Sequence, residues 1–331
     1  MRIGVIGAGA VGGLLAALLD RAGHDVEVTA RGDHLAAIRA DGIRLDGGYG
    51  EHVARVAAGP VLASRPDLCV LATKAQDGEE ALRANAAALS GGVPVLVAQN
   101  GLGGIRVAGE VLPGSPLLGG LALFATSYLS PGRITVTAAL PILLGAGPGA
   151  DAEMLERVAE TFRAALPVEV TDDLDAAQWS KLMINHVNAL PAITGMSVQE
   201  VVADPGLRRV MAGSLRETAR IAHDLGIRYA AIQGVPGWLL GAMRWMPLAG
   251  VAAFPRMLAR RMGDVPNPGS TLQSIRRGQR TEIDFLNGAV VRAAGEIGRA
   301  APVNAALVEM VHEVESSGAF LSPATVVARV P

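Results

Sequence analysis

The chain has 331 residues, of which half are hydrophobic and only 3% are aromatic. Its formal net charge is −2, so it lacks the basic excess that is typical of proteins that bind nucleic acids. A chain of this length favours two domains over one. The single cysteine, Cys69, has no partner for an intrachain disulfide, which fits a reducing compartment.

The sequence predicts neither a secretion signal nor a membrane span. The first six residues indicate a strand, and they lack the separate apolar core and cleavage site of a signal peptide. The most apolar stretch, residues 230–259, is interrupted by Pro236, Pro247 and Pro255, so no run of about 20 apolar residues remains. We therefore expect a cytoplasmic protein.

Strand and helix patterns alternate through the first half of the chain. Short apolar runs at residues 3–6, 26–29, 68–73 and 93–98 indicate strands, and helical stretches follow them. Such alternation predicts an α/β fold of the Rossmann type, in which a doubly wound, mainly parallel sheet has helices on both faces. A further helix at 151–165 and a last strand at 168–170 complete this half.

Three features add detail to this half. Residues 43–57 indicate a hairpin around Gly47 and Gly48, and residues 117–146 indicate an added antiparallel portion of the sheet. Asp33 is expected to cap a short helix that extends to Ala40.

From Thr171 onward the sequence contains no convincing strand. The segments 172–193, 205–225, 281–298 and 304–316 carry apolar residues at helical spacing. We therefore expect an all-helical C-terminal domain, with one domain formed by residues 1–170 and the other by residues 171–331.

A glycine-rich turn links the first expected strand to the first expected helix. In its G-x-G-x-x-G pattern, Gly7 permits the tight turn, Gly9 lets the backbone approach a pyrophosphate, and Gly12 allows helix and strand to pack closely. The positive end of the helix then faces the phosphates, which predicts a dinucleotide site; an ordinary glycine-rich turn is the weaker alternative. The turn consists of Gly7, Ala8, Gly9, Ala10, Val11 and Gly12.

The end of the second expected strand indicates which dinucleotide binds. Chains that bind NAD usually carry Asp or Glu there, whereas this chain has Thr29, Ala30 and Arg31. An arginine would meet the 2′-phosphate of NADP, so we expect NADP(H); a solvated loop arginine is the alternative. Residues 1–170 would then bind NADP, and residues 171–331 would supply the substrate and catalytic residues.

Only two of the 29 basic residues are lysines, Lys74 and Lys181. Lysine, unlike arginine, can lose its proton at a workable pH. On a helix, Lys181, Asn185 and Asn188 fall on one face at i, i+4 and i+7, which gives a polar stripe suited to a cleft. The alternative is a partly exposed face with a snorkelling lysine, which the scarcity of lysine disfavours.

Several motifs together resemble the ketopantoate reductase (2-dehydropantoate 2-reductase) family. They follow the family's order and span nearly the whole chain. Besides the glycine-rich turn, they are Thr73-Lys74-Ala75, Gln99-Asn100-Gly101-Leu102-Gly103, Trp179-Ser180-Lys181-Leu182 with Asn185, and Thr281-Glu282-Ile283-Asp284-Phe285-Leu286-Asn287-Gly288.

The resemblance implies a role for each matching residue. Arg31 and Lys74 would bind the adenosine phosphate region of NADPH, and Asn100 would lie near its ribose and nicotinamide. Lys181 would be the general acid. Glu282 would be its charged catalytic partner and would also bind the cofactor. The substrate ligands would be Asn185, Asn188, Ser270 and Asn100, and no metal is expected.

The resemblance implies the NADPH-dependent reduction of ketopantoate to pantoate in pantothenate biosynthesis, with a small 2-oxo acid as the partner. Two alternatives stay open: a reductase of another, bulkier 2-oxo acid, and a non-catalytic NADP-binding sensor, which the intact Lys181 and Glu282 disfavour. The apolar stretch 228–267 is long for the family. It would line or cover the substrate cleft, extend the core, or form the surface of a homodimer.

Overall fold

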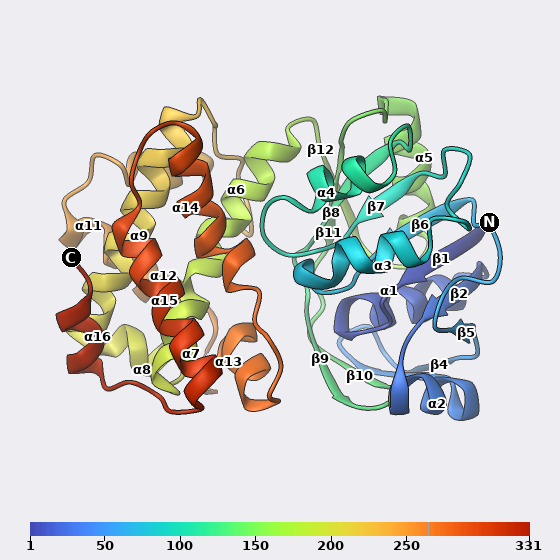
Figure 1. Ribbon diagram of the computed structural model, residues 1–331, viewed down its shortest axis with the longest axis horizontal. Helices are drawn as coiled ribbons and strands as arrows, with labels where there is room; N and C mark the ends of the chain where they lie inside the picture. The colour runs from blue at the N-terminus through green and yellow to red at the C-terminus, as the bar shows by residue number, and fades with distance from the viewer. Residues whose placement is uncertain (264) are drawn as a thin grey trace. The chain divides into compact units, whose positions relative to one another are not determined.

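The computed structural model describes residues 1–263 and 265–331, and these form two compact units. The first unit is Met1–Leu174 and the second is Asp175–Pro331. The first unit contains strands and helices (Figure 1). In the second unit the described residues form helices, and a single bridge pairs Ile232 with Val235. An α/β chain with a Rossmann-type first half and a helical second half is thus confirmed.

An eight-stranded sheet forms the centre of the first unit. Its strand order is β12-β11-β8-β7-β6-β1-β2-β5, and every neighbouring pair runs parallel except β8 and β11. In chain order the strands are β1 (Arg2–Ile6), β2 (Asp25–Thr29), β5 (Ala57–Gly59), β6 (Leu68–Leu71), β7 (Val95–Val97), β8 (Leu117–Ala122), β11 (Ile142–Ala146) and β12 (Val168–Thr171).

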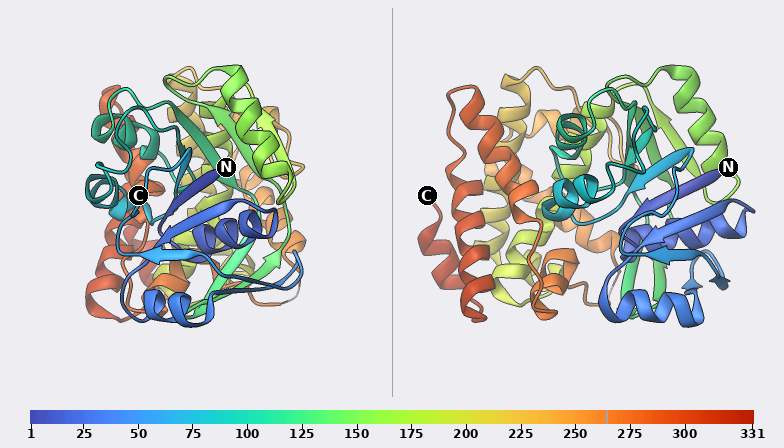
Figure 2. Two further views of the ribbon diagram at one scale, coloured as in Figure 1. Left: turned by 90° about the vertical axis from the view of Figure 1, so that its right-hand side faces the viewer. Right: turned by 45° about the vertical axis from the view of Figure 1, so that its right-hand side comes forward.

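Helices cover both faces of this sheet because its central strands are apolar on both sides. One face packs against α1 (Ala10–Arg21) and α5 (Ala152–Arg163). The other face packs against α3 (Gly78–Ala84) and α4 (Gly104–Val111). The left view of Figure 2 shows α3 and α4, in cyan and teal, across the strands from α5, in light green.

A second sheet covers the outer side of α1, with strand order β4-β3-β10-β9. The expected hairpin is confirmed as the antiparallel pair of β3 (Ile43–Gly47) and β4 (His52–Ala54). The expectation for residues 117–146 is only partly right, because β9 (Ala125–Ser130) and β10 (Arg133–Ala138) leave the main sheet and β10 pairs with β3. The physical reason is α1, which is buried all round from Gly12 to Leu19 and needs an apolar layer on each side.

The helix after β2 begins earlier than the sequence suggests. Helix α2 (Gly32–Asp41) has Arg31 at its N-cap, and no side chain caps it by a hydrogen bond. The prediction that Asp33 caps this helix is therefore wrong. Asp33 lies inside the first turn, where its negative charge favours the positive end of the helix dipole.

The second unit is organised around α9 (Pro205–Asp224), a long helix whose start is capped by Asp204. Among the described residues, no helix is long and apolar enough to cross a membrane. The remaining elements are α6 (Leu174–Asn185), η2 (His186–Asn188), α7 (Ala189–Thr194), α8 (Val198–Ala203), α10 (Gly237–Ala242), α11 (Leu248–Val251), α12 (Ala253–Arg261), α13 (Gly269–Arg276), η3 (Ile283–Phe285), α14 (Asn287–Glu296), α15 (Pro302–Ser317) and α16 (Pro323–Arg329).

The long apolar stretch that precedes α13 forms the three short helices α10, α11 and α12. All three pack against α9, and α12 also packs against α8. Buried side chains such as Met243, Phe254 and Leu258 extend the core of the unit. Trp238 and Trp245 instead remain 73% and 75% exposed.

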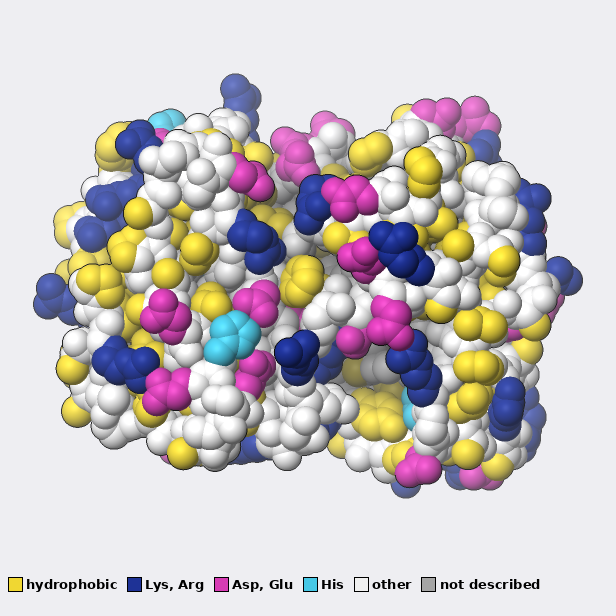
Figure 3. All heavy atoms as spheres, viewed as in Figure 1, with side chains coloured by type: hydrophobic (Ala, Val, Ile, Leu, Met, Phe, Trp, Pro, Cys, Tyr) yellow, Lys and Arg dark blue, Asp and Glu magenta, His cyan; other side chains and the backbone are white. Residues whose placement is uncertain are grey.

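Charged side chains of both signs are interspersed over the face shown in Figure 3, without a large area of one sign. On that face, the distribution agrees with the near-neutral charge of the whole chain.

Candidate active site

The glycine-rich turn between β1 and α1 has the backbone that its sequence requires. Gly7 adopts a φ of +94°, and a Cβ there would lie 2.7 Å from the side chain of Thr73. A Cβ on Gly12 would collide with the carbonyl oxygen of Gly7. These two glycines are therefore needed to fold the turn tightly against the strand and the helix.

The same turn leaves room for a ligand. A Cβ built on Gly9 would meet no protein atom within 4 Å, and no side chain caps the start of α1. The first amides of a helix need acceptors, and a phosphate can supply them. Of the six turn residues, Ala8 and Gly12 are buried and the other four are partly exposed, so the turn fits a dinucleotide.

Thr29, at the end of β2, fixes the position of this turn. Its hydroxyl accepts a hydrogen bond from the amide of Gly7 at 2.9 Å, and its carbonyl accepts one from the amide of Ala8 at 2.9 Å. His34 on α2 contacts the carbonyl of Ala8 at 2.6 Å. The sequence predicted neither the role of Thr29 nor that of His34. The signal available for Thr29 was a hydroxyl residue at the strand end beside the turn.

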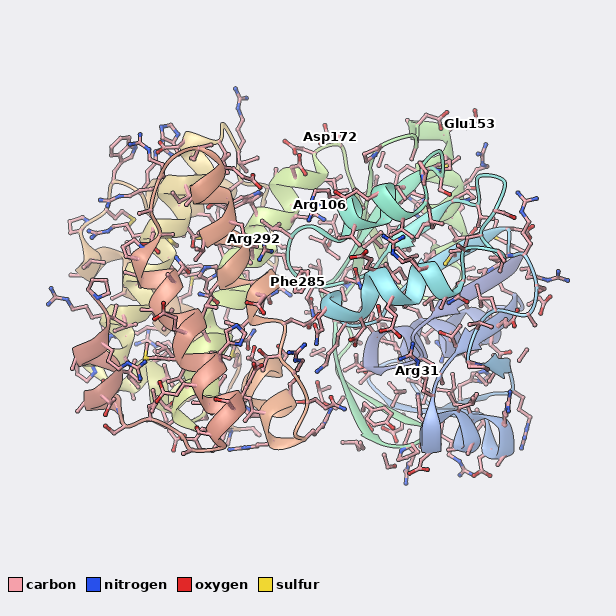
Figure 4. All side chains as sticks on the ribbon, in the orientation of Figure 1. Arg31, Arg106, Glu153, Asp172, Phe285 and Arg292 are labelled. Atoms are coloured by element: carbon pink, nitrogen blue, oxygen red, sulfur yellow. The ribbon has the colours of Figure 1, made fainter. Side chains whose placement is uncertain are left out.

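Arg31 lies just after β2, next to the strand that leads into the glycine-rich turn. Figure 4 shows its side chain at the start of α2. Its guanidinium pairs with the carboxylate of Glu80 on α3 at 3.2 Å, and both side chains are more than two-thirds exposed. An exposed ion pair of this kind is weak, so a phosphate can compete for the guanidinium.

Lys74 and Asn100 follow the neighbouring parallel strands β6 and β7, and both are half-buried. The amide nitrogen of Gln99 joins the two loops, because it donates to the hydroxyl of Thr73 at 3.1 Å and to the carbonyl of Lys74 at 3.2 Å. Since the carboxyl ends of parallel strands share one edge, the glycine-rich turn, Arg31, Lys74 and Asn100 gather at the same edge of the sheet.

In the second unit, the structure brings Lys181 together with Glu282. Lys181 lies on α6 and Glu282 immediately precedes η3. Burial lowers the pKa of Lys181 to about 8, and the negative charge of Glu282 opposes this shift. The amine is therefore poised to exchange a proton near neutral pH.

The expected substrate ligands lie on the same and adjoining elements. Asn185 ends α6, and Asn188 ends η2 in a buried position. Gly269, which begins α13, approaches Asn188 so closely that a Cβ there would collide with its side-chain oxygen. Ser270, the next residue, is exposed on α13, which packs against η2 and α7.

The turn that carries Glu282 is braced from several sides. The ring of His312 bridges the carboxylates of Asp284 and Glu315 at 3.0 Å each, and Glu315 accepts the amide of Thr281 at 2.7 Å. Arg292 donates to the carbonyl of Asp284 at 2.7 Å. Its guanidinium also lies 5.7 Å from the ring centre of Phe285, and Figure 4 labels this pair. Glu282 is thus held on a fixed turn.

A buried hydrogen-bond network fixes the end of α6. The ring nitrogens of His186 contact the carbonyl of Leu182 at 2.7 Å and the hydroxyl of Thr218 at 2.8 Å. Burial lowers the pKa of His186 to about 4, so the ring stays neutral. Asn304 continues the network, since it accepts from Ser214 and Asn287 at 2.8 Å each.

This network joins α9, α14 and α15 to η2, which directly follows the helix that carries Lys181. Sequence reasoning missed it, although His186 directly follows Asn185 and Asn287 belongs to a motif that also contains Glu282. The side chains of these two residues hold elements together, which explains them without a catalytic role.

Two protein-family models match the chain. One, described as "Ketopantoate reductase PanE/ApbA", matches residues 3–149. The other, "Ketopantoate reductase PanE/ApbA C terminal", matches residues 173–315. Together these matches cover the glycine-rich turn and the paired Lys181 and Glu282.

Similar proteins span nearly the whole chain. The 2-dehydropantoate 2-reductase of Pyrococcus horikoshii is 30% identical over 96% of this chain and 99% of its own length. That of Mesorhizobium japonicum is 32% identical over 90% of this chain and 92% of its own. The crystal structure of a PanE/ApbA family ketopantoate reductase from Ralstonia eutropha has a TM-score of 0.82 and 29% identity, over 96% of this chain and 99% of that one. The chain therefore belongs to the ketopantoate reductase family of oxidoreductases, which act on CH–OH groups.

Proposed function

We propose that the protein reduces 2-dehydropantoate (ketopantoate) to pantoate with NADPH, in the cytoplasm and as a step of pantothenate biosynthesis. The family is NAD(P)-dependent, and the relatives named above are 2-dehydropantoate 2-reductases. The observation that carries the proposal is the pairing of Lys181, whose pKa is lowered to about 8, with Glu282. A sensor without catalytic activity would have no use for such an amine.

The cofactor would be held at the edge of the main sheet. The glycine-rich turn would receive the pyrophosphate, Arg31 and Lys74 the adenosine phosphate region, and Asn100 the ribose and nicotinamide end. Bound NADPH supplies the hydride that reduces the ketone. In this proposal the residues of the first unit bind and orient, and they take no part in proton transfer.

The second unit would supply the proton. As the ketone carbon is reduced, negative charge develops on its oxygen, and the Lys181 ammonium stabilises this charge and then donates a proton from Nζ. Asn185, Asn188 and Ser270 would orient the substrate carboxylate with neutral groups. Because these groups carry no negative charge, they do not cancel the charge of the lysine.

The charge of Glu282 should set the pH range of the reaction. Glu282 raises the pKa of Lys181 against the effect of burial, so Glu282→Gln should lower that pKa further. A lysine that donates a proton is active below its pKa. We therefore expect the alkaline limb of kcat/KM for ketone reduction to move to lower pH in Glu282→Gln, as measured by NADPH oxidation across the pH range.

Glu296→Gln is the matched control for this prediction. Glu296 is an exposed carboxylate at the end of α14, in the same unit as Glu282. Its removal should leave the alkaline limb in place. An alkaline limb that stays unchanged in Glu282→Gln would remove the carboxylate from its assigned role.

The substrate is tested by NADPH oxidation with a panel of 2-oxo acids that includes ketopantoate. We expect the highest kcat/KM with ketopantoate. A higher value with a larger 2-oxo acid would favour the bulkier-substrate alternative, and the long stretch 228–267 would then deserve testing as a pocket wall. A lack of oxidation with every acid, despite NADPH binding, would favour the sensor.

A further inference from the structure

A separate cavity of about 640 Å³ lies within the second unit. It is lined by the end of α9, the turn after it, helix α10 and the two residues Arg244 and Trp245. None of Lys181, Asn185, Asn188, Ser270 and Glu282 lines it. Its volume falls within the range that small-molecule sites commonly occupy.

Two residues of the cavity lining each carry a buried hydrogen-bond donor that has no partner among the described residues. These donors are the hydroxyl of Tyr229 and the Nε of Arg244. Burial raises the pKa of Tyr229, so its hydroxyl keeps its proton and can donate. Buried donors are nearly always paired in folded proteins, so two orphans in one cavity indicate a missing acceptor.

The Arg244 side chain is held in place before any ligand arrives. One terminal nitrogen donates to the carbonyl of Gly241 at 2.9 Å, and the guanidinium lies 5.2 Å from the ring centre of Trp245. The ring of His223 meets the same tryptophan edge-on at 6.1 Å. These contacts leave Nε as the unpaired donor of a fixed group.

The lining combines positively charged side chains with large apolar rings. The lining includes Arg228, Arg244 and His223 and contains neither Asp nor Glu. Trp238 and Trp245 add two large rings that are mostly exposed, which is uncommon for tryptophan in the absence of a ligand or partner. The cavity therefore combines donors for an anion with a surface for a flat apolar group.

We propose that this cavity binds a small aromatic carboxylate, at a site that is distinct from the proposed active site and goes beyond the proposed function. One carboxylate accepts from the Tyr229 hydroxyl and from Arg244 Nε, so that its two oxygens match the two donors. The aromatic ring lies against Trp238 and Trp245. A phosphate fits less well, because its additional oxygens would be buried without donors.

The test is calorimetric titration of the full-length protein with benzoate, with benzamide as the neutral probe of the same shape. We expect benzoate to bind and benzamide to bind far more weakly. Tyr229→Phe should raise the Kd for benzoate about tenfold, because it removes one hydrogen bond to a charged group. Tryptophan fluorescence should change on binding, since the ring lies against two tryptophans.

Two substitutions at Gly241 test the cavity without removing a buried side chain from the fold. Gly241 lines the cavity on α10, and a Cβ there would lie at an ordinary distance, 3.5 Å, from the Arg244 side chain. Gly241→Ala should therefore bind benzoate like the wild type, whereas Gly241→Leu should fill the cavity and abolish binding. Both variants should keep the wild-type rate of NADPH oxidation.

Lys181→Ala distinguishes this cavity from the proposed active site. Benzoate should bind to Lys181→Ala with an unchanged Kd. Loss of binding in that variant, with binding retained in Tyr229→Phe and Gly241→Leu, would place benzoate at the active site and overturn the proposal. Equal affinity for benzamide, or no binding of benzoate at millimolar concentrations, would overturn it as well.

Discussion

Lys181→Ala is expected to lower kcat for ketopantoate reduction by about 10²- to 10⁴-fold, the range that a positioned acid usually contributes. Lys181 is the titratable amine of the candidate site, with its pKa lowered to about 8. NADPH affinity should stay nearly unchanged, because the expected cofactor ligands other than Glu282 belong to the first unit. Steady-state NADPH oxidation and NADPH fluorescence titration measure the two quantities separately.

Two further variants sharpen this test. Lys181→Arg keeps the positive charge, yet it should also fail, because a guanidinium cannot readily give up its proton. Lys74→Ala removes the other lysine of the chain, and it should weaken NADPH binding while kcat is largely retained. Near-normal turnover in Lys181→Ala would exclude the lysine as the acid.

In the wild type, kcat/KM for reduction should fall as the pH rises through about 8, because the acid is protonated only below its pKa.

Arg31→Ala is expected to raise the Kd for NADPH by about 10- to 100-fold and to leave the Kd for NADH nearly unchanged. A charge-assisted hydrogen bond to the 2′-phosphate contributes about 1.5–3 kcal/mol, and NADH lacks that group. The loss of Arg31 also leaves the Glu80 carboxylate without its partner close to the expected phosphate. Titration of the wild type and of Arg31→Ala with both cofactors gives the ratio of the two Kd values for each protein.

Glu80→Gln is the matched variant for Arg31. It removes the carboxylate that pairs with the guanidinium at 3.2 Å, so it should strengthen NADPH binding modestly. If Arg31→Ala weakened the binding of both cofactors equally, Arg31 would not contact the 2′-phosphate.

The sequence indicates candidate site residues where the chemistry depends on a local pattern. The glycine-rich turn could be recognised because its three glycines stand at fixed spacing between an apolar strand and an apolar helix. The rarity of lysine in this chain indicated Lys181 as a candidate, and helical spacing indicated Asn185 and Asn188 on the same helix face. The pairing of Lys181 with Glu282 required the resemblance to a family, since about a hundred residues separate the two motifs.

Contacts between distant elements could not be predicted in this way. The pairing of Arg31 with Glu80 joins residues 49 positions apart, and the contact of His186 with Thr218 joins residues 32 apart. The small second sheet was missed for a related reason. Apolar alternation predicts that residues 125–138 form strands, but it does not say which sheet they join.

The lowered pKa of Lys181 has a practical consequence for covalent chemistry. At pH 7 an amine with a pKa of about 8 is neutral in about a tenth of the molecules, whereas an ordinary lysine is neutral in fewer than about one in a thousand. Only a neutral amine attacks an acylating reagent. The other amines of the chain are Lys74 and the N-terminus, so the labelling of Lys181 can be followed on its own peptide. The fraction labelled would then count the active sites in any preparation of the enzyme.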